Sequence, residues 1–98
     1  MNVEQIDDVL VIKLPSRLDA AGLSVIERDF SETVAAHKGK VLADMSDVNF
    51  VASLALRMLL MSLKAIQPQG GDLRLAGLQP QIAEIFRNIG TFLKELTT

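Results

Sequence analysis

The residues that could carry catalytic or ligand-binding chemistry are few in this 98-residue chain, and most fall between residues 44 and 57. The single histidine, His37, lies near the expected end of a helix without the second positioned group that a general base requires. Asp44 and Asp47 are three residues apart in an expected loop, where carboxylates usually cap backbone amides. Ser53 follows them with no base beside it. The segment therefore favours recognition or regulation at Ser53 over catalysis.

Cofactor and metal sites are not expected either. The glycines lack the spacing of a phosphate-binding loop or a dinucleotide-binding fingerprint. No cysteine is present, which excludes a disulfide framework and a thiolate metal site. A hydrolase with Ser53 as its nucleophile remains a distant alternative.

Hydrophobic periodicity predicts strands and helices that alternate along the chain. Strands are expected over residues 3–6, 9–14, 41–44 and 72–76. Helices are expected over Ala20–His37, over Ser53–Ile66, and from Pro80 to a stop at Gly90, with a further turn or two in residues 91–98. Asp19 is a good N-cap for the first helix, and Gly39 is a suitable stop after it. Alternating strands and helices indicate one α/β domain over residues 1–98 with a mostly parallel sheet.

The expected helix Ser53–Ile66 is apolar around most of its circumference. One side collects Ala55, Met58, Leu59, Leu63 and Ile66. The opposite side is a thin polar stripe of Ser53, Arg57 and Lys64, flanked by Leu54, Leu60 and Met61. These flanking side chains either belong to the core or form a partly exposed contact surface.

Charge and composition limit the class of partner. Twelve acidic and ten basic residues give a net charge of -2, and the basic residues are scattered, so nucleic acid is not the expected partner. The N-terminus lacks the pattern of a secretory signal, and no apolar run reaches the ~20 residues that span a bilayer. We therefore expect a cytoplasmic protein without membrane insertion.

Residues 44–56, which read DMSDVNFVASLAL, resemble the signature of STAS domains of the anti-sigma factor antagonist type. That signature reads Asp-Leu-Ser-x-Val-x-Phe-hydrophobic-Asp-Ser-Ser/Thr-Gly-Leu. Further matches occur at Leu18-Asp19, Gly70-Gly71 and Ile89-Gly90. The resemblance implies an α/β fold with a four- or five-stranded mixed sheet and helices packed mainly on one face.

The resemblance also implies a partner switch without catalysis by the domain itself. In that family an unphosphorylated antagonist binds an anti-sigma factor, which is a serine kinase that phosphorylates the antagonist, and a PP2C-type phosphatase reverses the step. The family's phosphoacceptor position is Ser53 here. The partner-binding surface implied in this way consists of Asp19, Val51, Ala52, Ser53, Leu54, Arg57, Leu60 and Met61.

Physical chemistry favours a switch at the same place. A serine at a helix start can cap free amides, worth ~1 kcal/mol, and a phosphate there is favoured by the same amides and by the helix dipole. Arg57, one turn further on, is positioned to pair with that phosphate.

The chain departs from the family signature around the serine. Ala52 replaces the family's Asp, Leu54 its second Ser/Thr and Ala55 its Gly, while Arg57 replaces a small residue. Loss of the carboxylate favours a second hypothesis, in which a non-switching STAS subunit docks permanently in a larger assembly, such as a signalling scaffold or a lipid-transport complex.

Overall fold

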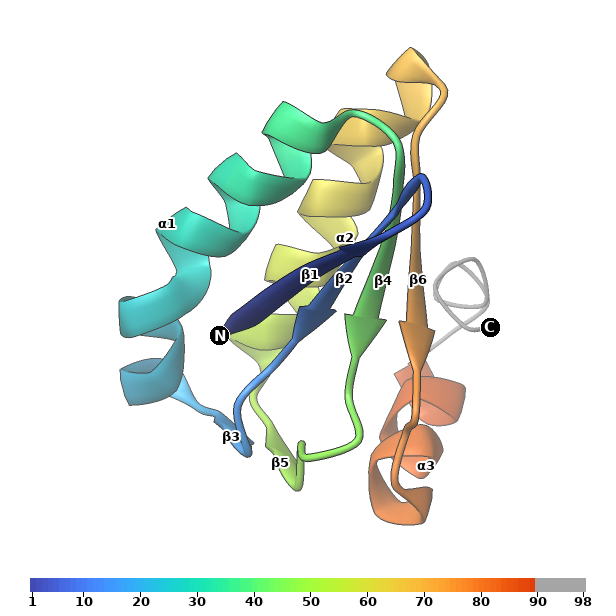
Figure 1. The fold of residues 1–98 in the computed structure, drawn as a ribbon. Helices are drawn as coiled ribbons and strands as arrows, with labels where there is room; N and C mark the ends of the chain where they lie inside the picture. Colours follow the sequence, from blue (N-terminus) through green and yellow to red (C-terminus); the bar gives the residue numbers. More distant parts are fainter. Residues whose placement is uncertain (90–98) are drawn as a thin grey trace.

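Four strands form a mixed sheet in the computed structural model, which describes residues 1–89 of the chain (Figure 1). They lie in the order β1-β2-β4-β6, with β1 antiparallel to β2 and the other neighbours parallel. The strands are β1 (Asn2–Ile6), β2 (Val9–Lys13), β4 (Lys40–Asp44) and β6 (Asp72–Ala76). All four strands expected from the sequence are thus confirmed, to within a residue at their ends.

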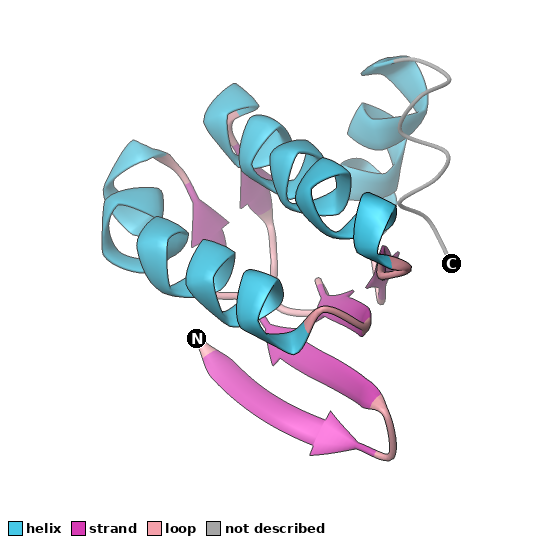
Figure 2. Cartoon of the chain, turned by 90° about the horizontal axis from the view of Figure 1, so that it is seen from above, coloured by secondary structure: helices cyan, strands magenta, loops and turns pink. Residues whose placement is uncertain are grey.

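Two long helices cover one face of this sheet. They are α1 (Ala20–His37) and α2 (Ser53–Ile66), which run side by side in the same direction (Figures 1 and 2). Their N-termini lie at the edge where β2, β4 and β6 end (Figure 1). A third helix, α3 (Pro80–Ile89), follows β6, and a short 3-10 helix, Gln67–Gln69, follows α2. The expected stop at Gly90 and the turn over residues 91–98 lie outside the described residues.

Alternation of side chains along the strands explains how the core forms. In β2, Leu10 and Ile12 point toward the helices and are buried, while the residues between them are only half-buried. The helices contribute buried side chains to the same core, among them Phe30 and Val34 from α1 and Leu59 from α2. All five residues of α2 assigned to its apolar side are buried, and Ser62 is buried beside them.

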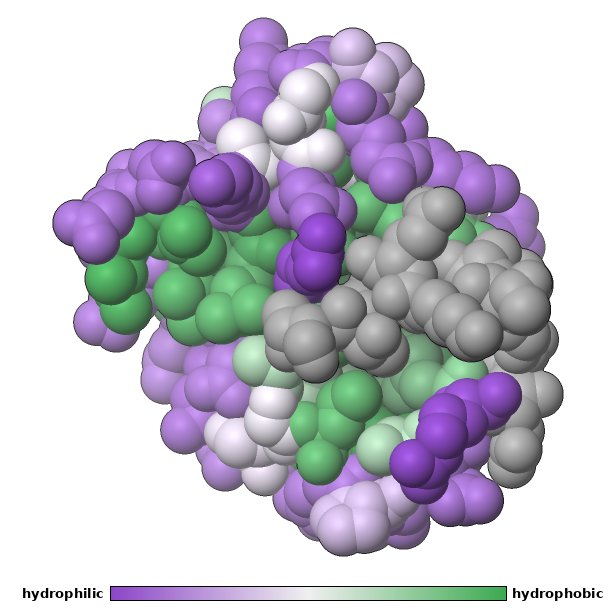
Figure 3. Space-filling view, turned by 90° about the vertical axis from the view of Figure 1, so that its right-hand side faces the viewer, coloured by the Kyte–Doolittle hydropathy of each residue, from purple (hydrophilic) through white to green (hydrophobic). Residues whose placement is uncertain are grey.

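The other face of the sheet is not covered by any of the described helices (Figures 1 and 2). It presents half-buried Val9, Val11 and Leu42, and exposed Ile6 from β1 lies next to them. Figure 3, which views the molecule from the right-hand side of Figure 1, shows apolar surface beside hydrophilic side chains. The run of branched residues in β2 is typical of a largely buried strand, whereas Val9 and Val11 on this face are half-buried.

A second, two-stranded sheet was not predicted from the sequence. It consists of β3 (Arg17–Leu18) and β5 (Phe50–Val51), paired in parallel with Leu18 opposite Val51. Each strand is only two residues long, too short for any periodicity to show. The main sheet therefore has four strands, and the two additional strands pair with each other instead of extending it.

The ends of α1 confirm one expectation and correct another. Asp19 is the N-cap, and its carboxylate Oδ1 accepts a hydrogen bond from the Gly22 amide at 2.8 Å. At the other end, Lys38 and not Gly39 adopts the left-handed conformation, with φ of 58°.

Within residues 1–89 no helix is long and apolar enough to cross a membrane.

Candidate functional site

The β3–β5 pair brings the starts of α1 and α2 together. The Asn49 amide donates to the Ser16 carbonyl at 2.9 Å, and the Ala52 amide donates to the Leu18 carbonyl at the same distance. Asp19 and Ser53, the residues that follow Leu18 and Ala52, are therefore placed at adjacent helix starts. The structure thus brings together two parts of the expected surface that are far apart in the sequence.

Asp19 has a structural role at this junction. Besides capping α1 it pairs with Arg17, whose Nε lies 3.2 Å from its Oδ2. The Gly22 amide, and then the Arg17 guanidinium, hold the pKa of the Asp19 carboxyl below its usual value. Gly22 itself is required by close packing, because a Cβ atom there would clash with the Arg17 carbonyl oxygen.

Ser53 is the first residue of α2, as expected, but it does not cap the helix. The N-cap position is Ala52, with extended backbone, and α2 has no side-chain cap. The reason is the β3–β5 pair, which holds the chain extended through Ala52, so that its carbonyl accepts the first helical bonds. The expected capping role of Ser53 is therefore wrong, and its side chain is exposed.

Free amides surround this serine. The main-chain amides of Ser53 and Leu54 donate to no acceptor that the described residues offer, whereas the next two amides bond to the Ala52 carbonyl. Unsatisfied amides of this kind carry the positive end of the helix dipole. The start of α2 is thus a polar, positively polarised spot with a hydroxyl on it.

Exposed apolar side chains lie next to this spot and further along α2. Leu54 is 56% exposed, Met61 is 58% exposed and Phe50 is 41% exposed. The Arg17 guanidinium stacks over the Phe50 ring, 4.7 Å from its centroid. Arg57 is also exposed, one turn after Ser53. Large exposed apolar groups along one edge of a helix and the strand before it are typical of a contact surface.

The remaining residues of the expected surface are less exposed to solvent. Val51 and Ala52 are half-buried in the junction with β3. Leu60 is half-buried and packs against the core. Leu54 and Met61 are therefore the exposed apolar members of that flank, while Leu60 faces inward.

Arg17 was not assigned to the site from the sequence, whereas Phe50 belongs to the loop of residues 48–52 that was expected to take part in binding. Their proximity depends on the β3–β5 register, in which these two residues are partners. The signature does contain a Phe at position 50, which was a signal for its importance, but nothing local links it to Arg17.

The loop after β4 is held by its own carboxylates. Asp44 Oδ1 accepts from the Ser46 amide at 2.9 Å, as its position in a loop predicted, and Asp47 pairs with Lys13 at 3.4 Å. The Ser46 amide and hydroxyl, followed by the Lys13 charge, lower the pKa of Asp44. In the described part of the chain, no three carboxylate or histidine side chains are grouped to hold a metal ion.

The fold and the serine-bearing start of α2 define the class of protein. The chain belongs to the STAS domain family, whose model matches residues 1–97. A sequence relative, "Putative anti-sigma factor antagonist BtrV" of Bordetella bronchiseptica, is 24% identical over 90 residues, which cover 92% of this chain and 78% of BtrV.

Solved structures share this fold. An anti-sigma factor antagonist (STAS) domain protein from Planctomyces limnophilus superimposes with a TM-score of 0.80 at 23% identity, covering 98% of this chain and 85% of that one. The phosphorylated form of the Bacillus cell fate determinant SpoIIAA gives 0.71 at 17% identity, with 99% and 87% covered. Murine Slc26a9, an anion transporter, contains the fold within a longer chain, with a TM-score of 0.71 at 16% identity and 96% and 16% covered. The expected STAS fold is confirmed.

Proposed function

We propose that this STAS domain is a regulatory protein-binding module of the anti-sigma factor antagonist type, without catalysis of its own. Its partner is an anti-sigma factor with serine kinase activity, and a PP2C-type phosphatase reverses the modification. The partner docks on residues 48–52, on Ser53 and on the exposed edge of α2. Phosphorylation of Ser53 releases the partner.

The observation that carries this proposal is the exposed hydroxyl of Ser53 at the start of α2. The Ser53 hydroxyl forms no capping hydrogen bond, so a kinase meets no competing intramolecular hydrogen bond there. The exposed Leu54 next to it provides apolar contact area for the same partner. The likeness to BtrV supports the class of partner.

A phosphate at this position would be tolerated by the free domain and opposed in the complex. In the free domain, the unpaired amides of Ser53 and Leu54 and the exposed Arg57 favour the negative charge. In the complex the charge would be desolvated beside Leu54 and Phe50. If desolvation costs about 4 kcal/mol, partner affinity falls about a thousandfold.

Phosphorylation by the partner tests the switch. The purified domain is incubated with the anti-sigma factor kinase and ATP, and the modified residue is located by mass spectrometry. We expect one phosphate, on Ser53, and none in Ser53→Ala. Ser24→Ala, which removes an exposed serine on α1, is the matched control and should be labelled like wild type. Label on another serine, or no label, would contradict the proposal.

The departure from the signature at Ala52 supports a second candidate function, a STAS subunit that docks permanently in a larger assembly. Ala52 lacks the carboxylate of the family signature, and its main-chain amide donates a hydrogen bond to the Leu18 carbonyl. Ser53→Asp separates the two functions. A switch predicts loss of partner binding in this variant, whereas permanent docking predicts wild-type binding.

A further inference from the structure

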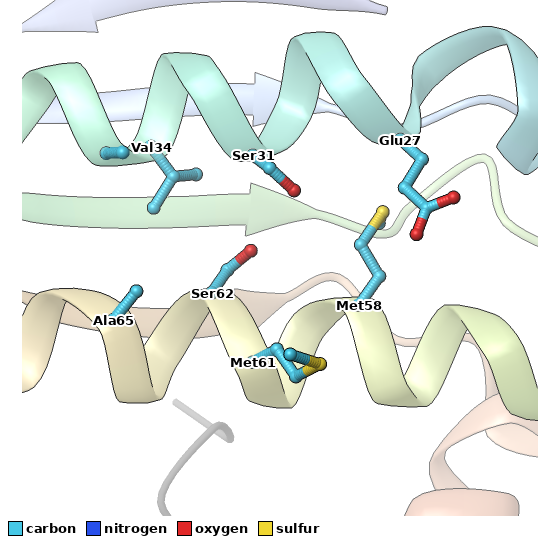
Figure 4. A pocket seen from close by; sticks show the side chains of 8 residues that line it. Glu27, Ser31, Val34, Met58, Met61, Ser62 and Ala65 are labelled. Carbon is cyan, nitrogen blue, oxygen red and sulfur yellow. The ribbon is translucent and has the colours of Figure 1, made fainter.

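A groove runs between α1 and α2, on the side of the helices that faces away from the sheet (Figure 4). Its volume is about 270 Å³. From α1 it is lined by Glu27, Ser31 and Val34, and from α2 by Met58, Met61 and Ser62. Figure 4 shows Ser31 and Val34 of α1 facing Ser62 and Met58 of α2, with Glu27 near Met58, while Met61 lies over α2 at the edge of the groove.

The dimensions of the groove suit a helix from another protein. Its lining extends from Glu27 to Ala35 on α1 and from Met58 to Ala65 on α2, which is about two helical turns or roughly 11 Å. Exposed Leu54 prolongs the α2 side by another turn. An amphipathic helix presents apolar side chains at this same spacing, and flexible methionine side chains adapt to their shape.

The charges beside the groove indicate the kind of helix. α2 carries Arg57 and Lys64 and has no acidic residue, although the protein as a whole is acidic. Both basic side chains are exposed, and neither forms an ion pair within residues 1–89. They lie two turns apart, along the edge of α2 that faces away from α1, since Met58 and Ser62 face α1.

The opposite side of the groove has the reverse charge. Glu27 is exposed and forms no ion pair with any described residue, whereas Arg28 next to it is paired with Glu32 at 3.1 Å. An acidic flank on a bound helix would be repelled by Glu27 and attracted by Arg57 and Lys64. The two sides together therefore select one orientation of an acidic helix.

We propose that the α1–α2 groove binds an amphipathic helix whose apolar stripe is bordered, on the flank that meets Arg57 and Lys64, by carboxylates. The inference rests on the proposed function in one respect, because the helix would belong to the same partner protein. It adds the type of element and the charge pattern by which that partner is recognised. Ser53 marks one end of this surface, and the groove extends it along α2.

Methionine methyl groups report on this groove directly. The chain has four methionines, of which Met58 and Met61 line the groove and Met45 is fully buried in the core. A domain labelled with 13C-methyl methionine is titrated with a synthetic peptide of about 18 residues, five helical turns. The peptide carries a leucine stripe bordered on one flank by glutamates, and the control peptide has lysines in their place.

We expect the methyl signals of Met58 and Met61 to shift with the acidic peptide while that of Met45 stays in place. The lysine peptide should bind about tenfold more weakly, and Arg57→Glu/Lys64→Glu should reverse this preference. These two side chains are exposed, so the variant should keep the circular dichroism spectrum of wild type. The inference is overturned if about 1 mM acidic peptide moves neither groove signal, if both peptides bind equally, or if the variant keeps the wild-type preference. The titration involves no kinase and the Ser53 labelling involves no peptide, so either proposal can fail alone.

Discussion

The main-chain amide of Ala52 donates a hydrogen bond to the carbonyl oxygen of Leu18, with 2.9 Å between the two atoms. Leu18 is followed by Asp19, the N-cap of α1, and Ala52 occupies the N-cap position of α2. One backbone contact thus links the starts of both helices. The exposed surface at the start of α2 keeps its place next to α1 because of it.

Replacement of Ala52 by proline tests this contact. Proline has no amide hydrogen, and the φ of -85° at Ala52 is close to the range that its ring allows. We expect the free energy of unfolding, measured with urea, to fall by about 1–3 kcal/mol, because the carbonyl of a fully buried residue loses its donor. Ala20→Pro, at the first position of α1, is the control, since proline is tolerated there. Equal stability of the two variants would show that the contact is dispensable.

The sequence predicted the main sheet and the helices because their signals are local. The apolar residues of α1 recur at helical spacing, and Asp19 precedes them at the position of a cap. The β3–β5 pair has no such signal. Its two-residue strands exist only because Leu18 and Val51 meet in the folded chain. The error at Ser53 has the same origin, since this tertiary pairing moved the cap position to Ala52.

Helical periodicity also could not separate the exposed from the half-buried residues on the flank of α2. Leu54, Leu60 and Met61 border the polar stripe in any helical projection. Which of them is covered depends on where α1 and the rest of the core lie. The folded structure leaves Leu54 and Met61 exposed and packs Leu60 against the core.

This difference in exposure predicts that one alanine substitution lowers stability and that two others weaken partner binding. Leu60→Ala should lower the free energy of unfolding by about 1–2 kcal/mol, since it removes half-buried apolar contacts. Leu54→Ala and Met61→Ala should change it by less than about 0.5 kcal/mol. The two exposed variants should instead weaken partner binding at least about fivefold, as measured by calorimetry. Wild-type affinity in both would remove this flank from the docking surface.

Ala52→Asp restores the carboxylate of the family signature and should have two effects. Aspartate at this N-cap position can accept from the free amides of α2, so stability should rise by about 1 kcal/mol. We also expect faster phosphorylation of Ser53 by the partner kinase. Ala52→Asn is the matched control, because it caps the helix without the charge. If the two variants are phosphorylated at the same rate, the carboxylate itself contributes nothing to the kinase reaction.

Among residues 1–89, two carboxylates have lowered pKa values, and they predict how stability depends on pH. Asp19 is hydrogen-bonded by the Gly22 amide and Arg17, and Asp44 by the amide and hydroxyl of Ser46. In each case the folded pKa of the carboxyl lies below its ordinary value of 3.8, which applies to the unfolded chain. Their contribution to stability is therefore complete above that value and is lost as the pH falls through the folded pKa.

Urea unfolding of wild type, Asp19→Asn and Asp44→Asn between about pH 7 and pH 2 measures this contribution. Wild type should lose stability on acidification, and each variant should lose less, because it lacks one carboxylate whose pKa is lowered in the folded protein. Asp19→Ala separates charge from capping: it should share the weaker pH dependence of Asp19→Asn but be less stable at every pH, since asparagine can still accept from the Gly22 amide. A wild-type pH dependence in Asp19→Asn would mean that the hydrogen bonds at the start of α1 do not favour the charged carboxylate.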